Sequence, residues 1–480
     1  MITSRTWAGK RYAVLGLARS GRATVEALLA SGAEVVAWDS DPQRRPGGGR
    51  GPLQDEGNSA ARGPGLRRDD IVWQDPLTLD LTGFTAVVVS PGVPLNRHPI
   101  AAHAAKYGVP IIGDIELFAQ ARAELLPHKV VGITGTNGKS TTTALVHHIL
   151  ETAGVPTTMG GNIGLPILGQ EPLPAGGVYV LELSSFQIDL TFTLDCDVAV
   201  LLNITPDHLD RYDGFEAYAA SKARLFEMQS TSSCAIIVNS DKVTQAIANR
   251  FTDRLFPVSI GKWSAAGISL TEGFDLLRDA AHGYYPTIIY VLGQNASRQD
   301  AWPSLQGPHN AQNAVVATAV IELLGKIGST FVRLHKALRT YPGLPHRMER
   351  IREVDGVLYV NDSKATNATS TAPALAAYPV IHWILGGQAK TDELDACVPH
   401  LGHVKTAFTI GRDSSMLANI LRDHGVAVSQ SITLDQAVKR ASIAAKPGET
   451  VLLSPACASF DQFKNFEDRG DQFRALVGAL

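Results

Sequence analysis

The segment 132–143, GITGTNGKSTTT, has the composition of a loop that binds nucleotide phosphates. It follows the apolar run 129–135 and precedes a segment of helical spacing. Backbone N–H groups in such a turn, and at the following helix N-terminus, converge on an anion. Lys139 would add a charge near the β- and γ-phosphates, and the hydroxyl of Ser140 or Thr141 would bind magnesium. The pattern GxxxxGK[ST] is met only with its first glycine displaced by one position; a glycine turn with a surface lysine is the alternative.

Two charged residues interrupt apolar patterns beyond this loop. Glu182 lies in the apolar run 177–183, where an ionised carboxylate is costly unless it is paired or bound to a metal. We interpret it as a magnesium ligand; a glutamate that reaches solvent or an arginine is the alternative. Lys222 lies on the apolar stripe of the expected helix 214–228. It either extends to water or is desolvated, which disfavours the ammonium form and leaves an amine that can react with carbon dioxide to give a metal-binding carbamate.

His208 follows the expected strand 197–204 and lies between Asp207 and Asp210. A neutral imidazole at this point could bind a second magnesium ion or orient a substrate. A loop histidine without a role is the alternative.

Polar and aromatic residues also gather in short segments of the last third of the chain. Arg347 could stabilise negative charge on a transferring phosphate, and Lys390 lies in a turn that suits a substrate carboxylate. The carboxyl ends of parallel strands are where ligand sites form in α/β proteins. The residues concerned are His346, Arg347, Asp362, Lys364, Thr366, Lys390, Ser459, Phe460 and Phe466.

Short apolar runs alternate with helical patterns along the chain, which predicts three consecutive α/β domains. We expect an N-terminal Rossmann-like domain (1–114), a central P-loop ATPase-like domain with a parallel sheet (115–343) and a C-terminal Rossmann-like domain (344–480). The expected helices include 20–32 and 309–328. The expected strands are 11–17, 34–39, 84–90, 109–114, 129–135, 177–183, 197–204, 234–240, 357–362, 380–387 and 449–456.

The first glycine turn, residues 16–21, resembles a dinucleotide-binding fingerprint together with Asp39, although Ala18 stands at the middle glycine position. A nicotinamide-binding or nucleotide-gated regulatory module is therefore an alternative function. The segment 42–70 is rich in Gly, Pro, Arg and Asp and has few large apolar residues. We expect it to be a mobile surface loop because it cannot bury enough surface to offset its ordering entropy.

Composition excludes several classes of protein. The length of 480 residues calls for more than one core. A hydrophobic fraction of 45% is typical of a folded soluble protein, and a formal charge of −3 argues against a chain built to grip nucleic acid. The four cysteines form no close pair, so neither a zinc site nor a disulfide framework is indicated. Without a signal segment or a membrane-length apolar stretch, we expect a cytoplasmic protein.

Eleven segments, in order along nearly the whole chain, resemble the Mur ligases, and most closely the branch that adds D-glutamate. They are VLGLARSG, SPGV, GDIELF, GTNGKST, GGNIG, ELSSFQ, NITPDHLDRY, GPHNAQN, GLPHR, NDSKATN and SPACASFDQF. The resemblance implies an ATP-dependent ligase that adds D-glutamate to UDP-N-acetylmuramoyl-L-alanine through an acyl phosphate, in peptidoglycan precursor synthesis. It further implies ATP and two Mg²⁺ ions, a carbamylated Lys222, small-molecule substrates, no nucleic acid or membrane partner, and a monomer.

The resemblance also implies a role for each matching residue. The catalytic residues would be Lys139, Glu182, His208 and Lys222. Magnesium would be held by Ser140, Glu182, His208 and the carbamylated Lys222. ATP would be bound by Gly135, Thr136, Asn137, Gly138, Lys139, Ser140, Thr141, Asn310, Asn313, Arg347 and Asp362. The UDP-substrate would contact Asp39, Ser40, Ser90, Pro91, Gly92, Asn162, Ser184, Gln187 and Asp207. D-Glutamate would contact Thr366, Lys390, Ser459 and Phe466.

Two other ligases remain open as alternatives. A folylpolyglutamate synthase shares the phosphate loop and the acyl-phosphate chemistry, but SPGV and NDSKATN favour the D-glutamate branch. A Mur ligase that adds a diamino acid would carry a DNPR-like segment where residues 361–367 read NDSKATN.

Overall fold

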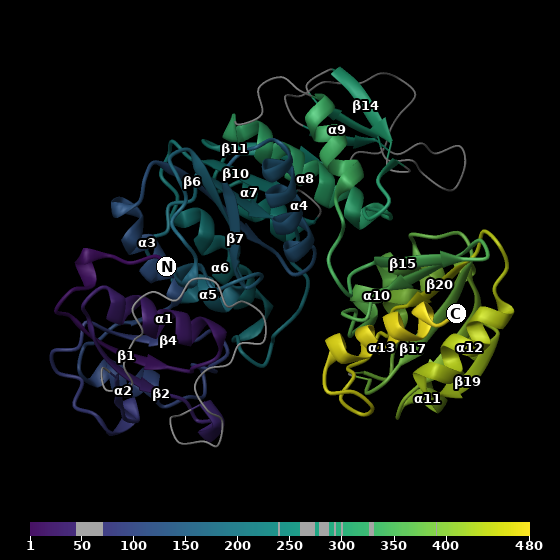
Figure 1. Ribbon diagram of the computed structural model, residues 1–480, viewed down its shortest axis with the longest axis horizontal. Coiled ribbons are helices and arrows are strands. Elements are labelled where there is room, and N and C mark those ends of the chain that lie inside the picture. The colour runs from purple at the N-terminus through teal and green to yellow at the C-terminus, as the bar shows by residue number, and fades with distance from the viewer. Residues whose placement is uncertain are drawn as a thin grey trace. The chain divides into compact units, whose positions relative to one another are not determined.

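The computed structural model describes residues 1–44, 71–238, 241–259, 274–277, 288–291, 294–298, 301–325, 331–389 and 391–480. The predicted loop 42–70 lies outside the described residues from residue 45 onward, and so does Lys390. The chain divides into two compact units, residues 1–258 with 319–328 and residues 259–318 with 329–480. Its strands form separate sheets in the N-terminal, middle and C-terminal parts of the chain (Figure 1).

The N-terminal sheet is parallel and has the order β3-β2-β1-β4-β5. Its strands are β1 (Arg11–Leu15), β2 (Glu34–Trp38), β3 (Ile71–Trp73), β4 (Ala86–Val89) and β5 (Ile111–Ile112). The apolar runs of β1 and β4 are almost wholly buried, as expected for strands covered on both faces. Helix α1 (Arg19–Ala30) follows the glycine turn after β1, so the predicted Rossmann-like βαβ unit is confirmed.

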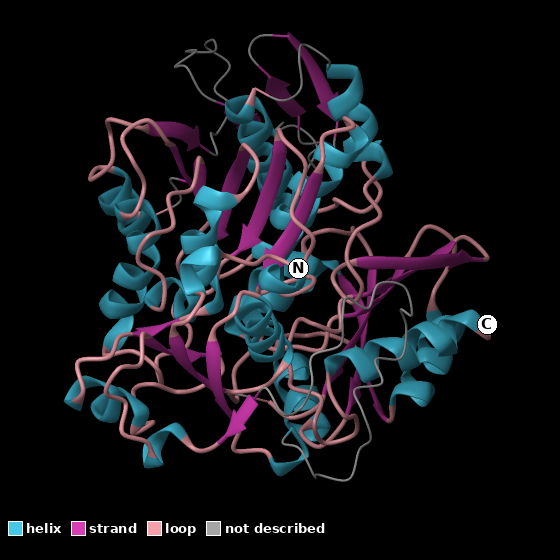
Figure 2. Ribbon diagram, turned by 60° about the vertical axis from the view of Figure 1, so that its left-hand side comes forward, coloured by secondary structure: helices cyan, strands magenta, loops and turns pink. Residues whose placement is uncertain are grey.

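The middle part contains a parallel sheet with the order β11-β10-β9-β6-β8-β7. Helix α4 (Lys139–Thr152) packs on β6, β8 and the edge strand β7, and α6 (Gly214–Glu227) packs against β9 and α5 (Ser185–Asp189). Figure 2 shows helices flanking these strands. The strands are β6 (His128–Thr134), β7 (Thr157–Gly161), β8 (Gly177–Glu182), β9 (Val198–Leu201), β10 (Cys234–Val238) and β11 (Leu255–Ser259).

Three further strands, which the sequence patterns did not reveal, pair antiparallel: β12 (Phe274–Leu277), β13 (Ile288–Val291) and β14 (Gln294–Arg298). Strands β12 and β13 are mostly apolar segments of four residues, which do not by themselves distinguish a strand from a helical segment, and β14 has the polar sequence QNASR. The chain then enters α8 (Pro308–Leu324), close to the predicted helix 309–328, followed by α9 (Phe331–Thr340).

The C-terminal sheet has the order β15-β16-β20-β17-β18-β19, and every pair is parallel except β15 with β16. Helix α13 (Phe466–Gly478) packs on β15 and β16 (Figure 1). The other elements are β15 (Glu349–Val354), β16 (Val357–Asn361), α10 (Ala368–Leu375), β17 (Ile381–Gly386), β18 (Val404–Ile410), α11 (Ser414–Asp423), β19 (Val428–Ile432), α12 (Leu434–Ala444) and β20 (Thr450–Leu453).

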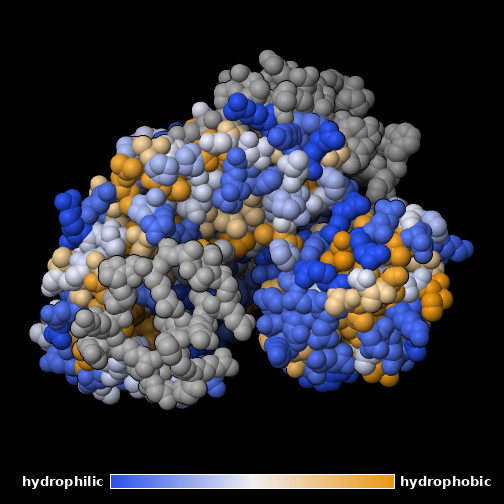
Figure 3. Space-filling model, viewed as in Figure 1, coloured by the Kyte–Doolittle hydropathy of each residue, from blue (hydrophilic) through white to orange (hydrophobic). Residues whose placement is uncertain are grey.

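Figure 3 shows hydrophobic and hydrophilic residues intermixed on one face of the molecule. Within the described part of the chain, no helix combines the length and the apolar character needed to cross a membrane.

A partly buried cluster of charged side chains surrounds Glu449, at the amino ends of the parallel strands of the C-terminal sheet. Its carboxylate accepts hydrogen bonds from Lys405 Nζ at 2.5 Å and from His382 Nε2 at 2.8 Å, and its side chain is 13% exposed. Burial raises the pKa of Glu449, but these hydrogen bonds outweigh burial and lower the pKa to about 2. The carboxylate therefore stabilises the folded state in its ionised form.

We predict that Glu449→Gln lowers the free energy of unfolding at neutral pH by about 2 kcal/mol, because charge-assisted hydrogen bonds are lost. The folded-state pKa lies below the unfolded one, so this stabilisation is complete above the unfolded pKa and disappears as pH falls through the folded pKa. Urea unfolding of both proteins should show a difference that narrows between about pH 4.5 and pH 2. A difference that does not change over this range would contradict the assignment.

Candidate active site

The predicted phosphate loop lies between β6 and α4, as the sequence indicated. Gly138 is the N-cap of α4 and has a φ of 85°, a left-handed conformation that favours glycine. At Gly135 an added Cβ would lie 3.1 Å from the Cβ of Leu202, so the loop runs close against the end of β9. The next residue, Asn203, also holds the loop, because its side-chain oxygen accepts from Asn137 N at 2.9 Å. The strand, loop and helix required by the motif are thus all present.

Two lysines converge on one backbone carbonyl of this loop. Lys139 Nζ and Lys222 Nζ donate to the oxygen of Gly135 at 2.9 Å and 3.0 Å, and Lys139 also donates to Thr136 O at 2.9 Å. Lys222 is only 1% exposed, which rules out the alternative that its side chain extends to water. Burial, followed by the charge of Lys139, holds the pKa of Lys222 well below its ordinary range. The neutral amine is therefore favoured at this position.

Glu182 ends β8 beside the loop and is 2% exposed. Its Oε1 accepts from Asn162 Nδ2 at 2.9 Å, whereas its Oε2 is buried without a hydrogen-bond partner among the described residues. The alternative of a solvent-reaching glutamate is thus wrong, and no arginine pairs with it within the described part of the chain. A buried carboxylate oxygen left without a partner is suited to a cation that arrives with a ligand.

His208 follows β9 in a left-handed conformation with a φ of 54°. Its ring lies 5.0 Å from the ring of Phe186, and the backbone N–H of His208 donates to Asp207 Oδ1 at 3.0 Å. Burial lowers the pKa of His208 below its usual value; the charges of Lys139 and Lys222 add to this effect and Asp207 opposes it. A neutral ring nitrogen is therefore available to a ligand at neutral pH. Among the described residues, no three His, Cys, Asp or Glu side chains form a ready-made metal site.

The predicted UDP-substrate residues of the N-terminal part shape the glycine turn. Asp39 is 3% exposed and accepts from Leu17 N at 2.5 Å and from Asp41 N at 2.8 Å. Burial raises the pKa of Asp39, but these two backbone hydrogen bonds help to bring it below its ordinary value. Ser90 Oγ donates to Gly16 O at 2.7 Å, and so fastens the turn to the end of β4. These contacts give Asp39 and Ser90 a structural role that the sequence did not specify.

Ser184 and Gln187, also predicted to contact the substrate, form the capping box of α5. The Ser184 side chain accepts from Gln187 N at 3.3 Å, and Gln187 Oε1 accepts from Ser184 N at 3.1 Å. The pair therefore fixes the start of α5, whose Phe186 contacts the His208 ring.

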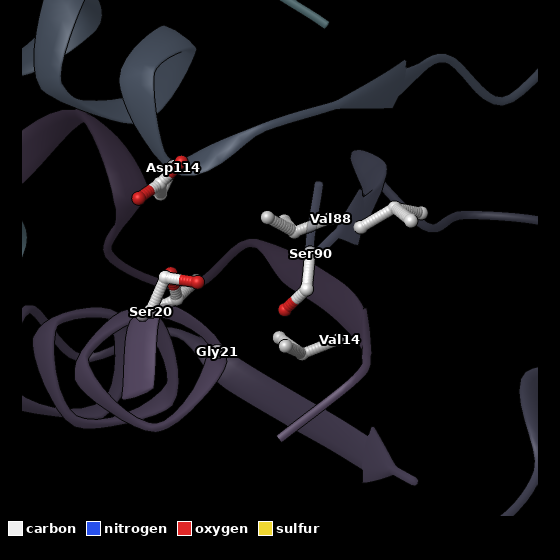
Figure 4. A pocket seen from close by; sticks show the side chains of 8 residues that line it. Val14, Ser20, Gly21, Val88, Ser90 and Asp114 are labelled. Atoms are coloured by element: carbon white, nitrogen blue, oxygen red, sulfur yellow. The ribbon is translucent and has the colours of Figure 1, made fainter. Parts of the chain in front are cut away.

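A small hollow lies beneath the glycine turn, lined by Ser20, Gly21, Ser90 and Asp114 among others (Figure 4). Asp114 begins α3 (Asp114–Ala121), is 4% exposed, and has no hydrogen-bond partner for either carboxylate oxygen among the described residues. Burial raises the pKa of Asp114 to about 6. The sequence motifs, GDIELF included, indicate no role for this carboxyl group, because its burial without a hydrogen-bond partner among the described residues arises only in the folded chain.

In the C-terminal unit, the described residues predicted to contact D-glutamate lie in loops at the carboxyl ends of adjacent strands and at the start of α13. Thr366 follows β16, Ser459 follows β20, and these strands are neighbours in the sheet together with β17. Phe466 begins α13, and its carbonyl accepts from Ser363 Oγ at 2.8 Å in the loop after β16. The sheet therefore brings the loops of Thr366, Ser459 and Phe466 to one edge, which is where α/β ligand sites form.

The predicted ATP residues of this unit are largely buried. Asp362 accepts from Met348 N at 3.2 Å and from Ser454 Oγ at 2.8 Å, and burial raises its pKa to about 7. Asn310 and Asn313 lie in α8, where Asn313 Nδ2 donates to Asn310 Oδ1 at 3.2 Å. The contacts with Met348 place the carboxyl of Asp362 beside the turn that carries Arg347.

Arg469 is a site residue that the sequence reasoning missed. It is fully buried in α13, and no carboxylate pairs with it among the described residues. Its guanidinium donates to Ser363 Oγ at 2.9 Å, to Ser363 O at 2.8 Å, to Cys457 O at 3.1 Å and to Gly386 O at 3.4 Å. Ser363 follows β16, Cys457 follows β20 and Gly386 is the last residue of β17, so one side chain connects the carboxyl ends of three adjacent strands.

A sequence signal for Arg469 existed. Arg469, Phe473 and Val477 recur every four residues and are all fully buried in α13. A charged residue on an apolar helical stripe is the same signal that drew attention to Lys222.

Comparisons with known proteins place these features in one family. Residues 133–321 match the model of the Mur ligase middle domain, and residues 346–457 match that of the Mur ligase, glutamate ligase domain. The chain is 56% identical over 481 residues to the UDP-N-acetylmuramoylalanine--D-glutamate ligase of Novosphingobium aromaticivorans, covering 100% of this chain and 97% of that protein. It is 56% identical over 485 residues to the protein of the same name from Sphingopyxis alaskensis, covering 100% of both.

Among solved structures, the UDP-N-acetylmuramate-alanine ligase of Thermotoga maritima is similar with a TM-score of 0.58, over 98% of this chain and 99% of that one. The identity is 16%, so this likeness concerns the fold alone. It agrees with the predicted series of three α/β domains, which is confirmed.

We predict that Arg469→Lys destabilises the C-terminal unit by about 2 to 4 kcal/mol. The single ammonium group of lysine cannot replace the planar guanidinium group, which donates to three backbone carbonyls at once. Urea unfolding measures this loss. The exposed Arg412, which pairs with Asp413, provides the control, since Arg412→Lys should leave the unfolding midpoint unchanged. Equal midpoints for the wild type and Arg469→Lys would contradict the structural role.

Proposed function

The chain belongs to the Mur ligase family, and from that premise we propose that it joins D-glutamate to UDP-N-acetylmuramoyl-L-alanine in peptidoglycan synthesis. The full-length similarity to ligases named for this reaction carries the proposal. ATP use follows from membership of the family. We further propose that the protein acts in the cytoplasm as a monomer, with domain boundaries at residues 114 and 343.

The phosphate loop supports a site for the triphosphate on the middle domain. The carbonyls of Gly135 and Thr136 accept from Lys139, and we propose that phosphate oxygens of a bound triphosphate would accept from the same ammonium group. We assign the backbone of 135–141 to the phosphates. Further ATP contacts are assigned to Asn310, Asn313, Arg347 and Asp362.

The buried oxygen of Glu182 and the hydroxyl of Ser140 would hold a divalent cation. His208 and a carbamylated Lys222 would hold a second ion. When bound, such ions neutralise charge on the phosphates and on the acceptor carboxylate. The low pKa of Lys222 favours the carbamate, because its neutral nitrogen can attack carbon dioxide and release one proton to water. The modification converts a buried cation into an oxygen ligand.

The substrates are assigned along the carboxyl edges of the sheets. Residues assigned to the UDP-sugar-alanine substrate are Asp39, Ser40, Ser90, Pro91, Gly92, Asn162, Ser184, Gln187 and Asp207. Residues assigned to D-glutamate are Thr366, Lys390, Ser459 and Phe466.

The proposed reaction requires positioned charge more than a protein nucleophile. The alanine carboxylate attacks the γ-phosphorus of ATP, the bond to ADP breaks, and an acyl phosphate forms. The amine of D-glutamate then attacks the acyl carbon, and phosphate leaves from the tetrahedral intermediate with the carboxylate oxygen. The chain supplies Lys139 and Arg347 to the transferring phosphoryl group.

We predict that ADP release in a coupled assay with UDP-N-acetylmuramoyl-L-alanine depends on D-glutamate within a panel of D- and L-amino acids. A site with fixed carboxylate partners distinguishes the two configurations, because only one of them brings the amine to the acyl carbon. Equal turnover with L-glutamate, or preference for a diamino acid, would contradict the proposed specificity.

We predict that Lys222→Ala lowers kcat by at least about 100-fold, since one carboxylate-like metal ligand is removed. Added short carboxylates such as acetate or formate should restore part of the activity by filling the space of the carbamate. Lys242, at the start of α7 (Lys242–Ala248), provides a control, because Lys242→Ala should retain full activity that is insensitive to these anions. A fully active Lys222→Ala protein would disprove the carbamate.

A further inference from the structure

The turn that carries Arg347 has an unusual backbone. His346 and Met348, the residues on either side of Arg347, have φ values of 61° and 48°. Residues other than glycine rarely adopt this left-handed backbone conformation. Each one costs of order 1–3 kcal/mol of conformational free energy and persists only where the surrounding structure enforces it. A turn of this kind therefore needs contacts that hold it in place.

Carboxylates and backbone provide these contacts. Glu349 Oε2 accepts from His346 N at 2.9 Å, and Asp362 Oδ1 accepts from Met348 N at 3.2 Å. The carbonyl of His346 accepts from Lys364 N at 3.1 Å. Hydrogen bonds to a carboxylate are stronger than those between neutral groups, so Glu349 and Asp362 fix the turn from both ends.

Glu349 is itself held by helix α13. Arg474 donates from Nη2 to Oε1 and Oε2 of Glu349 at 2.7 Å and 2.9 Å, and from Nε to Oε1 at 3.1 Å. Asn361 Nδ2 donates to Glu349 Oε2 at 3.0 Å. The Glu349 side chain is 19% exposed, so its bidentate ion pair with Arg474 is partly shielded from water. Its geometry leaves the carboxylate little freedom to turn away from His346.

The His346 side chain makes a second connection to the same helix. Its Nδ1 lies 3.1 Å from Asn361 Nδ2, and its ring lies 6.1 Å from that of Phe466. A Cβ at Gly470 would lie 2.1 Å from His346 Nδ1, so the ring occupies space that only a glycine leaves open. Helix α13 thus contacts both the backbone support and the side chain of this turn.

We propose that Glu349 is a positioning residue that, together with Arg474, fixes the left-handed turn presenting Arg347 to the transferring phosphate. The inference rests on the proposed function for the role of Arg347, whereas the support of the turn rests on the contacts of Glu349 alone. It also gives α13 a dual function, because the helix that begins at Phe466 supports the D-glutamate side and the phosphate side together.

A matched pair of variants tests the proposal. Glu349→Ala and Glu449→Ala each remove a partly shielded, ion-paired carboxylate from the same domain, but Glu449 lies at the opposite edge of the sheet. We expect Glu349→Ala to lower kcat by about 100-fold, since a shift of about 1 Å in a positioned group has an effect of this size. Glu449→Ala should retain kcat to within about twofold, and Glu349→Gln should lose about tenfold because it keeps one acceptor oxygen.

The kinetic pattern separates positioning from general loosening. We expect the KM for D-glutamate to stay within about twofold in Glu349→Gln, because the hydrogen bonds described for Glu349 go to His346, Asn361 and Arg474 and not to the residues assigned to D-glutamate. A loosened domain would instead raise this KM and lower kcat in both glutamate variants. Equal losses of kcat in Glu349→Ala and Glu449→Ala would overturn the proposal; if the alanine variants do not fold, Glu349→Gln and Glu449→Gln give the same comparison.

Amide hydrogen exchange gives a readout that does not require activity. The peptide 344–349 should exchange at least about tenfold faster in Glu349→Gln than in the wild type, and at the wild-type rate in Glu449→Gln. Unchanged exchange in Glu349→Gln would overturn the support of the turn even if kcat falls. If the wild type lacks ligase activity, the proposed function fails, while the exchange measurement still decides whether Glu349 holds the turn.

Discussion

The structure depends on one electrostatic constraint, the convergence of two lysine nitrogens on the carbonyl oxygen of Gly135. Two ammonium groups cannot share such a place without cost, and the burial of Lys222 resolves the conflict by lowering its pKa. The loop therefore combines one cation, Lys139, with one buried lysine whose neutral amine is favoured. An anionic ligand such as a triphosphate would relieve the remaining positive charge.

Buried ionisable groups also occur near the carboxyl ends of strands in the middle and C-terminal sheets. Glu182, Asp362 and Arg469 are charged or ionisable groups buried at or near the carboxyl ends of parallel strands. Burial of such groups is costly unless hydrogen bonds or ligands compensate. Arg469 is compensated by three backbone carbonyls, and Glu182 keeps one buried oxygen without a hydrogen-bond partner among the described residues. The parallel sheets thus bring buried polar groups to the strand ends at which we propose the ligand sites.

Much of the fold was predictable because apolar runs and glycine turns are local signals. The phosphate loop and the parallel strands of the central sheet were anticipated from spacing, whereas spacing left open whether Lys222 is buried or extends to water. The strands β12–β14 were not anticipated, since β12 and β13 are mostly apolar segments of only four residues and β14 has no apolar run. Segment 45–70 and Lys390 lie outside the described residues, so their predicted roles stay predictions.

The supports of the site were much harder to predict than its ligands. Arg474 and Glu349 are separated by 125 residues, and Arg469 and Ser363 by 106, so no local pattern indicates that they meet. The left-handed backbone at His346 is equally hidden, because a histidine gives no sign of a positive φ. The candidate ligand residues lie in motifs of consecutive residues, which the sequence shows directly. The residues that support these motifs are distant in sequence and come together only in the folded chain.

Isotope transfer tests the central claim, that the loop presents a triphosphate to a substrate carboxylate, most directly. UDP-N-acetylmuramoyl-L-alanine with ¹⁸O in both carboxylate oxygens should yield inorganic phosphate carrying one labelled oxygen and an amide carbonyl carrying the other. Phosphate without label would show that the carboxylate never attacks the γ-phosphorus, and would contradict the account.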